Sequence, residues 1–521
     1  MALIPALTSF TPGTLAKAGE VTGNFSSIRN TLNTYGMFTD VAATVTAAGL
    51  AFSGTEAVVL SDSGTVAAAY LNTIDGTTTG AVNATLAVAV SGAATAVAQA
   101  LTSGGIVYNG SETVTLSETS LDASVIKSID QSTTGQVTAT AATTLTGTVA
   151  NLVAVVTSQG VTLNGSETIT VTDTGAVSAA DLLTVDGKTT TQINATSVSA
   201  LSGDMNTVAQ AMTASGIALS SSVAVSLSET SMDAATLKTV DLGTTALVSA
   251  TQVVTLTGRA TDVAFVVTST GVSLSGSEAI TLTDTGTVAA DDLVTIDGKT
   301  TVVVDARTAT TLTGTLTALT GVVTGGTVTL NGSEALTVTD TGTVTAAELN
   351  TIDSLTGGLV DAHLATALTG TAAALVTAVN SAGISLSGGE AITVTDTTGT
   401  VALSDLNTID GKTSVVVDAR AVTALSGTAT TLAVAVTATT LTLNGSEAIT
   451  VTDTGTVTAA DLNAIDTRTT GLVDAHAATA LTGTVAALVA AVTSAGISLS
   501  GGETITLTDT GTVAADDLVT I

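Results

Sequence analysis

The segment Ser275–Thr301 reads SGSEAITLTDTGTVAADDLVTIDGKTT, and it decides the fold because nearly the same wording recurs along the chain. It returns as NGSEALTVTDTGTVTAAELNTID from Asn331 and as NGSEAITVTDTGTVTAADLNAID from Asn444. The position of the Glu in GSE recurs at a nearly constant spacing, once in each copy. It holds Val223 in one copy and a glutamate in the others: Glu56, Glu112, Glu167, Glu278, Glu334, Glu390, Glu447 and Glu503. A period this regular predicts an array of stacked repeats.

Each repeat divides into two similar halves, and each half has the pattern of a short helix followed by short strands. The helix pattern is seen in VAADDLVTI from Val288 to Ile296, where apolar residues recur at spacings of three and four. The strand pattern is seen in AITLTDT, where Ile280 and Leu282 share one face and Thr281 and Thr283 share the other. Corners carry residue pairs that tolerate a positive φ, such as Asn164-Gly165 and Ser275-Gly276.

A half-repeat of about 28 residues cannot bury its apolar face alone, so the coils must stack and pair their strands with those of neighbouring coils. We therefore predict an α/β repeat fold: a parallel solenoid with about 28 residues per coil and about 56 per repeat. Nine imperfect repeats occupy residues 43–521, and the last one is truncated at TVAADDLVTI, a phrase that elsewhere continues DGKTT. We expect the natural chain to continue beyond Ile521, because the ends of a solenoid are usually atypical capping repeats.

Composition excludes several classes of function. The chain has 521 residues, a formal net charge of −32 and only 11 Lys and Arg, so we expect no nucleic-acid partner. No apolar run reaches the length needed to span a membrane, and we expect no membrane insertion. Cysteine is absent, which removes disulfides and thiolate chemistry. The first residues, MALIPALTSFTPG, lack the charged and apolar regions of a signal peptide.

Residues 1–42 do not belong to the repeat and predict an amphipathic helical segment. Its apolar residues recur mostly at spacings of three and four: Leu15, Val21, Phe25, Ile28, Leu32 and Tyr35. One interpretation is that this helix caps the first coil. The other is that it is a docking or oligomerisation element, and the two are compatible because a cap can face a partner.

Two stretches of the chain resemble known families. The segment GTLAKAGEVTGNFSSIRNTLN is similar to the N-terminal segments of phage tail-fibre and virion-fibre proteins. The phrases DLNTIDGKTS, TALTGTAA and SGSEAITLTDT resemble giant repetitive surface proteins of marine cyanobacteria and appendage proteins of their phages. The first likeness covers only that short segment, and the second covers roughly residues 43–521. Together they imply a virion appendage of a cyanophage.

The residues that normally carry catalysis are sparse, and we expect no enzymatic activity. The two histidines, His363 and His476, occupy a position that holds Arg307 and Arg420 in other copies and threonine in earlier ones. A position that accepts Thr, Arg and His points to solvent, and an Asp stands two residues before each of the four cations. We predict an exposed charged stripe formed by Arg307, His363, Arg420 and His476, with pairs worth under about 1 kcal/mol each.

Acidic residues recur at three positions: the glutamates above, the Asp of TID and the acid of TDT or SET. We expect these acids to face water, each Asp to accept hydrogen bonds from local turns or helix ends, and the charge to keep the chain in solution. Ca²⁺ bridging between the carboxylates is the second interpretation, although no single loop gathers the five or more oxygens of a dedicated site. We expect no other cofactor. Thr-x-Thr rows would suit ice binding, but VSLSET and VVLSDS interrupt them.

The function predicted is structural: a fibre or spike shaft of a phage particle that contributes to attachment to the host cell. Residues 1–42 would dock on other virion proteins, and a host receptor would bind the exposed stripe or a part of the chain beyond Ile521. The resemblance to phage fibres implies trimers, although a coil that closes its own core is compatible with a monomer. The alternative is a bacterial or cyanobacterial cell-surface adhesion protein. The two differ in location, virion or cell surface.

Overall fold

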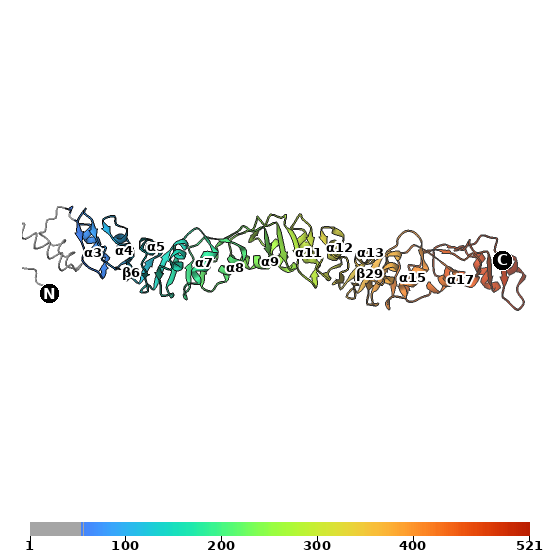
Figure 1. The fold of residues 1–521 in the computed structure, drawn as a ribbon. Coiled ribbons are helices and arrows are strands. Elements are labelled where there is room, and N and C mark those ends of the chain that lie inside the picture. The colour runs from blue at the N-terminus through green and yellow to red at the C-terminus, as the bar shows by residue number, and fades with distance from the viewer. Residues whose placement is uncertain (1–53, 56) are drawn as a thin grey trace, which may run out of the picture. The chain divides into compact units, whose positions relative to one another are not determined.

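A computed structural model describes Gly54, Thr55 and residues 57–521 of the chain. These residues form 17 short helices and 41 short strands in strict repetition (Figure 1). The chain divides into two units. The first runs to Met232 and includes Thr236–Val253 and Ser269–Ser275; the second comprises Asp233–Ala235, Val254–Thr268 and Gly276–Ile521. The expected α/β repeat fold with parallel strands is confirmed within each unit. The expected segment 1–42 and the boundary at residue 43 lie outside the described residues.

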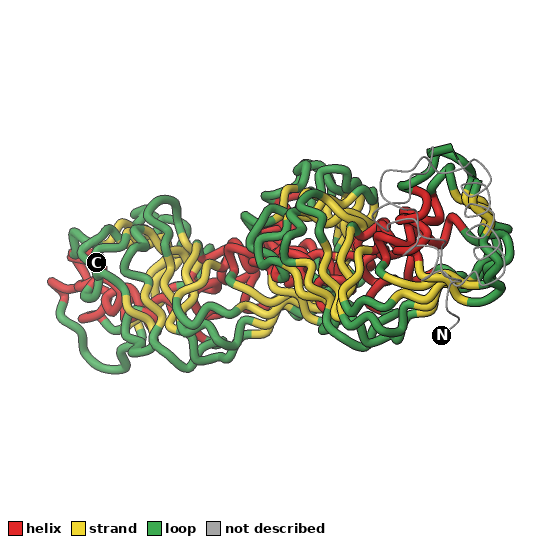
Figure 2. The backbone as a smooth tube through the Cα atoms, turned by 90° about the vertical axis from the view of Figure 1, so that its left-hand side faces the viewer, coloured by secondary structure: helices red, strands yellow, loops and turns green. Residues whose placement is uncertain are grey.

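The helices are six to ten residues long and follow one another in chain order. They are α3 (Ala68–Asp75), α4 (Ala94–Thr102), α5 (Ala123–Ser132), α6 (Val149–Thr157), α7 (Ala179–Asp186), α8 (Met205–Thr213), α9 (Ala234–Leu242), α10 (Ala260–Thr268), α11 (Ala290–Asp297), α12 (Leu316–Gly325), α13 (Ala346–Leu355), α14 (Ala372–Asn380), α15 (Leu403–Asp410), α16 (Ala429–Ala435), α17 (Ala459–Asp466), α18 (Val485–Thr493) and α19 (Ala515–Thr520). Most consecutive helices within a unit contact each other, and the strands form separate layers beside them (Figure 2).

The strands of the first unit form one three-stranded and three five-stranded sheets. The three-stranded sheet contains β1 (Val58–Val59), β3 (Val82–Asn83) and β5 (Ile106–Val107). The next contains β2 (Thr65–Ala67), β4 (Ala89–Gly92), β6 (Thr113–Leu116), β8 (Val137–Thr138) and β10 (Val161–Thr162). Then follow β7 (Ser120–Asp122), β9 (Thr144–Gly147), β11 (Thr168–Val171), β13 (Ile193–Ala195) and β15 (Ile217–Leu219), and β12 (Ala176–Ser178), β14 (Ala200–Gly203), β16 (Ala224–Leu227), β18 (Val248–Ser249) and β20 (Val272–Ser273).

The second unit repeats this arrangement. One sheet includes β19 (Thr255–Gly258), β21 (Ala279–Leu282), β23 (Val304–Asp305) and β25 (Val328–Thr329), with β17 at Ser231–Asp233 where the two units meet in sequence. The next contains β22 (Thr287–Ala289), β24 (Thr311–Gly314), β26 (Ala335–Val338), β28 (Val360–Asp361) and β30 (Ile384–Ser385). The others contain β27 (Thr343–Thr345), β29 (Ala367–Gly370), β31 (Ala391–Val394), β33 (Val417–Asp418) and β35 (Leu441–Thr442); β32 (Val401–Ala402), β34 (Ala424–Gly427), β36 (Ala448–Val451), β38 (Val473–Asp474) and β40 (Ile497–Ser498); and β37 (Thr456–Thr458), β39 (Ala480–Gly483) and β41 (Thr504–Leu507).

Strands and helices follow two different periods. In the sheet from β22 to β30, the residues that pair are evenly spaced along the sequence and all buried: Val288, Leu312, Leu336, Val360 and Ile384. Helices α11, α12 and α13 begin at Ala290, Leu316 and Ala346, so their starts are farther apart than the paired strand residues. The predicted average of about 28 residues per coil therefore holds for the helices, whereas the hydrogen-bonded strands follow a shorter period.

This difference explains why a sheet has five strands. β22 ends at Ala289, immediately before α11, whereas β30 ends at Ser385 and the next helix, α15, begins only at Leu403. Each further strand of a sheet thus lies farther, along the chain, from the helix that follows it. A new sheet begins once in every repeat, for example with β22 at Thr287 and then with β27 at Thr343. The loops absorb the extra residues.

Helix packing relies on a narrow stripe of small and branched aliphatic residues. In α11 the buried residues are Ala290, Leu293 and Ile296, spaced by three. The predicted helix from Val288 begins two residues later, because Val288 is part of β22 and pairs with Leu312. At the helix start the strand of the next coil comes so close that a Cβ at Gly314 would lie 2.9 Å from Cβ of Ala290. This position therefore needs glycine.

Candidate functional site

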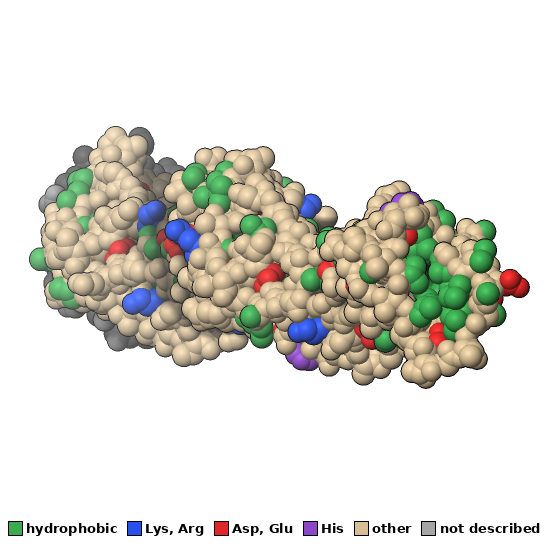
Figure 3. Space-filling view, turned by 90° about the vertical axis from the view of Figure 1, so that its right-hand side faces the viewer, with side chains coloured by type: hydrophobic (Ala, Val, Ile, Leu, Met, Phe, Trp, Pro, Cys, Tyr) green, Lys and Arg blue, Asp and Glu red, His purple; other side chains and the backbone are tan. Residues whose placement is uncertain are grey.

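The repeated glutamates are buried, which corrects the expectation that the repeated acids face water. Their side chains are at most 2% exposed in six copies: Glu112, Glu167, Glu278, Glu334, Glu390 and Glu447. Val223, in the same position of another copy, is 1% exposed. On the face shown in Figure 3, Asp and Glu side chains are visible only at scattered places. At these six positions the carboxylate lies inside the fold.

Each buried glutamate closes its own turn. Glu334 accepts hydrogen bonds from the backbone N–H of Asn331 (2.5 Å) and of Gly332 (3.0 Å). Gly332 has φ of +81°, which places both amides on the carboxylate side of the turn and confirms the predicted positive φ at the corner. The hydroxyl of Thr356, one coil later, donates to the backbone carbonyl of Glu334 at 2.6 Å. The carboxylate oxygens of Glu334 thus receive their hydrogen bonds from the backbone of their own turn.

The Asn of the same turn connects neighbouring coils. Asn331 accepts from the backbone N–H of Ser333 at 2.8 Å through Oδ1. Its Nδ2 donates to the carbonyls of Arg307 and Ala309, both 3.1 Å away in the preceding coil. The turn is thus held from both sides, by its own glutamate and by the backbone below it.

The Asp of TID binds a hydroxyl in the next coil. Asp353 Oδ2 accepts from Ser381 Oγ at 2.7 Å, and Ser381 Oγ also accepts from the backbone N–H of Gly383 at 3.1 Å. A Cβ at Gly383 would lie only 2.0 Å from Asp353 Oδ1, so the carboxylate occupies the space of a side chain there. In two copies the glycine is replaced by Thr327 or Thr440, and the threonine hydroxyl donates to the Asp instead, at 2.8 and 2.9 Å.

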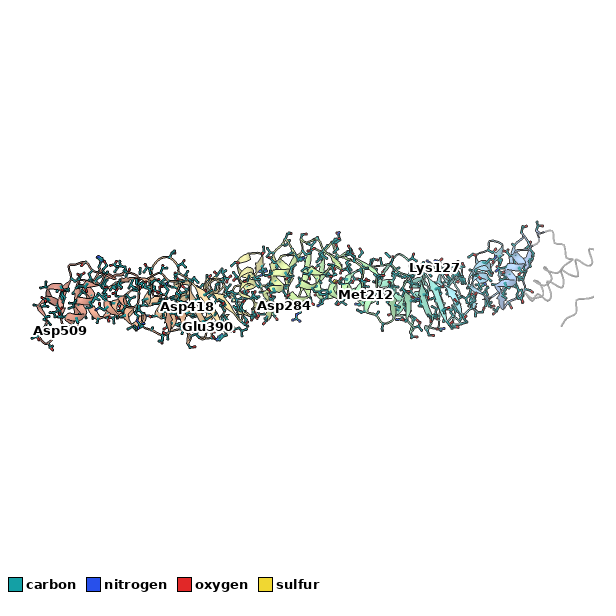
Figure 4. All side chains as sticks on the ribbon, turned by 180° about the vertical axis from the view of Figure 1, so that it is seen from behind. Lys127, Met212, Asp284, Glu390, Asp418 and Asp509 are labelled. Atoms are coloured by element: carbon teal, nitrogen blue, oxygen red, sulfur yellow. The ribbon has the colours of Figure 1, made fainter. Side chains whose placement is uncertain are left out.

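The acid of TDT or SET binds the first amide of a helix, as expected. Asp396 Oδ2 accepts from the backbone N–H of Ala372, the first residue of α14, at 2.7 Å. The same contact with the helix of the preceding coil, at 2.6 or 2.7 Å, is made by Glu118, Asp173, Glu229, Asp284, Asp340, Asp453 and Asp509. Asp284 and Asp509 are labelled in Figure 4. A negative charge at this end of a helix also opposes the partial positive charge of the helix dipole.

The four side chains of the predicted stripe are exposed, as expected. Side-chain exposure is 63% for Arg307, 53% for His363, 65% for Arg420 and 55% for His476. Each lies two positions after the end of the fourth strand of its sheet, which is β23, β28, β33 or β38. The structure therefore places them at equivalent positions of four successive repeats of the second unit.

Each of these side chains pairs with the Asp two residues before it. Arg307 donates to both carboxylate oxygens of Asp305, from Nε at 2.9 Å and Nη2 at 2.6 Å. Arg420 binds Asp418 in the same way, and this hydrogen bonding lowers the pKa of Asp418 to about 2. His363 Nδ1 lies 2.7 Å from Asp361 Oδ1.

An uncharged version of this pair occupies the same turn in the first unit. There Asn83 Oδ1 accepts from the backbone N–H of Thr85 at 3.1 Å and from its hydroxyl at 2.8 Å. In the second unit Asp305 Oδ1 likewise accepts from the backbone N–H of Arg307, at 3.2 Å. The Asp–Arg and Asp–His pairs therefore occupy the same kind of turn as the uncharged Asn–Thr pair. The turn itself does not require the Arg or His side chain.

Three further features bear on binding. Within Gly54–Ile521, leaving aside the undescribed residue 56, no group of three or more His, Asp or Glu side chains is arranged to hold a metal ion. In the same range no helix is long and apolar enough to cross a membrane. A pocket of about 440 Å³ lies beside the end of α16, where Leu441, Gly445, Glu447 and Arg468 form part of its lining.

The predicted docking residues Leu15, Val21, Phe25, Ile28, Leu32 and Tyr35 lie outside the described residues. What sequence reasoning missed is the burial of the glutamates and the role of the Ser, Thr and Gly that surround each carboxylate. One signal was present: Val223 stands where other copies have Glu, and an aliphatic side chain in that position indicates burial.

A scan against protein-family models gives no match. A search of the curated proteins also gives none.

Proposed function

We propose that the chain is a structural protein, the shaft of an appendage on a phage particle. The observation that carries the structural part is the use of the repeated acids. Glu334, Asp353 and Asp396 represent the three repeated positions, and each accepts hydrogen bonds from backbone or hydroxyl groups of the same stack of coils. The repeated wording thereby supplies the contacts that hold one coil on the next, which is what a scaffold requires.

The virion part of the proposal rests on the resemblance of GTLAKAGEVTGNFSSIRNTLN to phage-fibre segments and of the repeats to cyanophage appendages. In this proposal residues 1–42 dock on other virion proteins, and the chain assembles as a homo-oligomer, with trimers as in other phage fibres. Attachment to a host receptor would use the exposed turns from Arg307 to His476. No catalytic step and no cofactor is part of the proposed function.

Electron microscopy of native particles tests the location directly. One antibody is raised against residues 1–42 and a second against the repeats, and both are applied to phage particles and to uninfected cells. We expect the first label at the particle and the second farther out. Labels found only on uninfected cells would overturn the virion assignment and favour the alternative, a cell-surface adhesion protein, which the likeness to cyanobacterial surface proteins supports.

A further inference from the structure

Four turns of the chain contain an Asn-Gly pair, at Asn109, Asn164, Asn331 and Asn444. Each Asn precedes a buried glutamate by three residues in the wording NGSE. The copy that has Val223 in place of the glutamate has Ser220-Ser221 in place of Asn-Gly. Asn-Gly therefore occurs in this chain only together with the buried carboxylate.

Asn-Gly is the dipeptide most prone to spontaneous deamidation, because glycine has no side chain to hinder the reaction. The glycine nitrogen loses its proton and attacks Cγ of Asn, the bond between Cγ and Nδ2 breaks, and ammonia leaves. Water then opens the cyclic imide at one of its two carbonyls and gives aspartate or isoaspartate. The reaction consumes one water, releases one ammonia and involves no oxidation or reduction.

The structure opposes the first step of this reaction. The N–H of the glycine, whose proton must be lost, donates to the buried carboxylate at 3.1 Å for Gly110, Gly165 and Gly445 and at 3.0 Å for Gly332. Loss of that proton would place a second negative charge beside a carboxylate that is at most 2% exposed. Two like charges at this distance repel strongly where water is excluded.

The leaving group is also held. Asn Nδ2 donates to a carbonyl of the preceding coil in each case. For Asn109, Asn164, Asn331 and Asn444 these carbonyls include Thr85 (3.4 Å), Ala142 (2.6 Å), Ala309 (3.1 Å) and Arg420 (2.9 Å). The backbone of the glycine is fixed at φ between +77° and +83° in the four turns. Neither side of the bond that must form is free to reorient while the coil is closed.

We propose that the four NGSE turns are potential deamidation sites and that the folded structure suppresses the reaction at them. The buried glutamate is the residue that suppresses it. Opening of a coil removes the carboxylate from the glycine nitrogen and frees the Asn side chain, and the modification then adds one negative charge at the corner. Because deamidation is not reversed, a deamidated turn would identify a coil that has opened. Asn444 is a suitable site for a test, because the contacts made by Glu447 and Thr469 can each be removed by a single substitution.

The test compares the full chain with its Glu447→Gln variant during long incubation at mildly alkaline pH. Peptide mapping by mass spectrometry measures deamidation at all four Asn-Gly pairs. We expect deamidation at Asn444 to rise about tenfold for each unit by which loss of the charge lowers the pKa of the glycine N–H. The other three sites in the same molecule are internal references and should not change. Glu390→Gln is the matched control, because its turn has Ser387-Gly388 and no Asn.

A second variant separates loss of the charge from simple opening of the coil. Thr469→Val removes the hydroxyl that donates to the carbonyl of Glu447 at 2.7 Å but leaves the carboxylate in place. Hydrogen exchange of residues 441–447 measures opening in both variants. At equal opening, we expect faster deamidation in Glu447→Gln. Equal rates would overturn the role of the carboxylate, as would a wild-type rate at Asn444 equal to that of a free peptide of the same sequence.

Discussion

At the scale of single residues, one contact occurs in two arrangements that serve the same purpose. In five repeats the Asp of TID or its equivalent binds a serine hydroxyl of the next coil, and glycine stands two positions after that serine, as in Asp353, Ser381 and Gly383. Where the hydroxyl belongs instead to Thr327 or Thr440, which take the place of that glycine, the serine position holds Gly325 or Ala438. The hydroxyl has moved by two positions while its acceptor stayed in place.

This alternation predicts a compensating double mutant. Ser381→Ala removes a hydrogen bond and should cost about 0.5–1.5 kcal/mol. Gly383→Thr crowds the Asp353 carboxylate and should cost about 1–3 kcal/mol. Together the two substitutions recreate the arrangement of Thr440, so the cost of the double mutant should be smaller than the sum. Urea denaturation of the four proteins measures the coupling, and strictly additive costs would show that the two arrangements are not interchangeable.

The Asp418 carboxylate should titrate at low pH. Hydrogen bonds from the Arg420 side chain and backbone, the first being the larger cause, lower its pKa from 3.8 to about 2. A lowered pKa in the folded state stabilises the fold above pH 4, and that contribution disappears as the pH falls through about 2. Carboxyl chemical shifts should show the pKa of Asp418 rising toward 3.8 in Arg420→Gln. Because solvent reaches both side chains, the thermal midpoint of Arg420→Gln at pH 7 should hardly differ from that of the unmodified chain. A large difference would mean that Arg420 makes a further stabilising contact besides the one with Asp418.

At the scale of elements, the helices of the TAAALVTAV type receive two caps from different coils. Thr371 accepts from the N–H of Ala374 in its own helix α14, and Asp396 accepts from the N–H of Ala372 across the coil boundary. The first cap is local and the second is a tertiary contact. The start of the helix and the stacking of coils are therefore coupled, because the N–H of Ala372 has this acceptor only when the next coil is in place.

Removing the second cap should loosen one helix end. We expect Asp396→Ala to destabilise the protein by about 0.5–2 kcal/mol, the usual cost of a lost N-cap, and Asp396→Asn to cost less because an acceptor remains. Hydrogen exchange should accelerate at the first turn of α14 and at the facing coil. Thr371→Ala is the matched control and should affect α14 alone. Equal exchange patterns in the two variants would contradict a coupling between coils.

The same scale shows why the sequence predicts some elements well and others poorly. The helix and strand types were predictable because Leu293 and Ile296, or Ile280 and Leu282, carry clear periodicities. The shorter period of the strands was not, because it depends on which residues pair between coils, and the repeat of the sequence does not reveal that. Burial of Glu334 was hidden for a related reason: a charged residue is buried only when amides such as that of Gly332 are brought to it by the fold.

At the scale of the whole molecule, the net charge determines how the stability of the fold depends on salt. The net charge of −32 opposes folding through repulsion, and salt screens that repulsion. The repeated carboxylates are already satisfied by amides and hydroxyls at Glu334, Asp353 and Asp396. A bound cation would have to displace those donors. Stabilisation by salt should therefore be general rather than specific to Ca²⁺.

We expect the thermal midpoint to rise with NaCl and then to level off as the Debye length falls below about 8 Å. At one ionic strength, CaCl₂ and MgCl₂ should give the same midpoint, because both act as divalent counterions to an acidic surface. Addition of a chelator at constant ionic strength should leave the midpoint unchanged. Mg²⁺ is the matched control, since it favours a tighter octahedral site and keeps its water where Ca²⁺ takes carboxylates. A midpoint that rises with Ca²⁺ alone and falls on chelation would overturn this expectation and show that calcium bridges the carboxylates between coils.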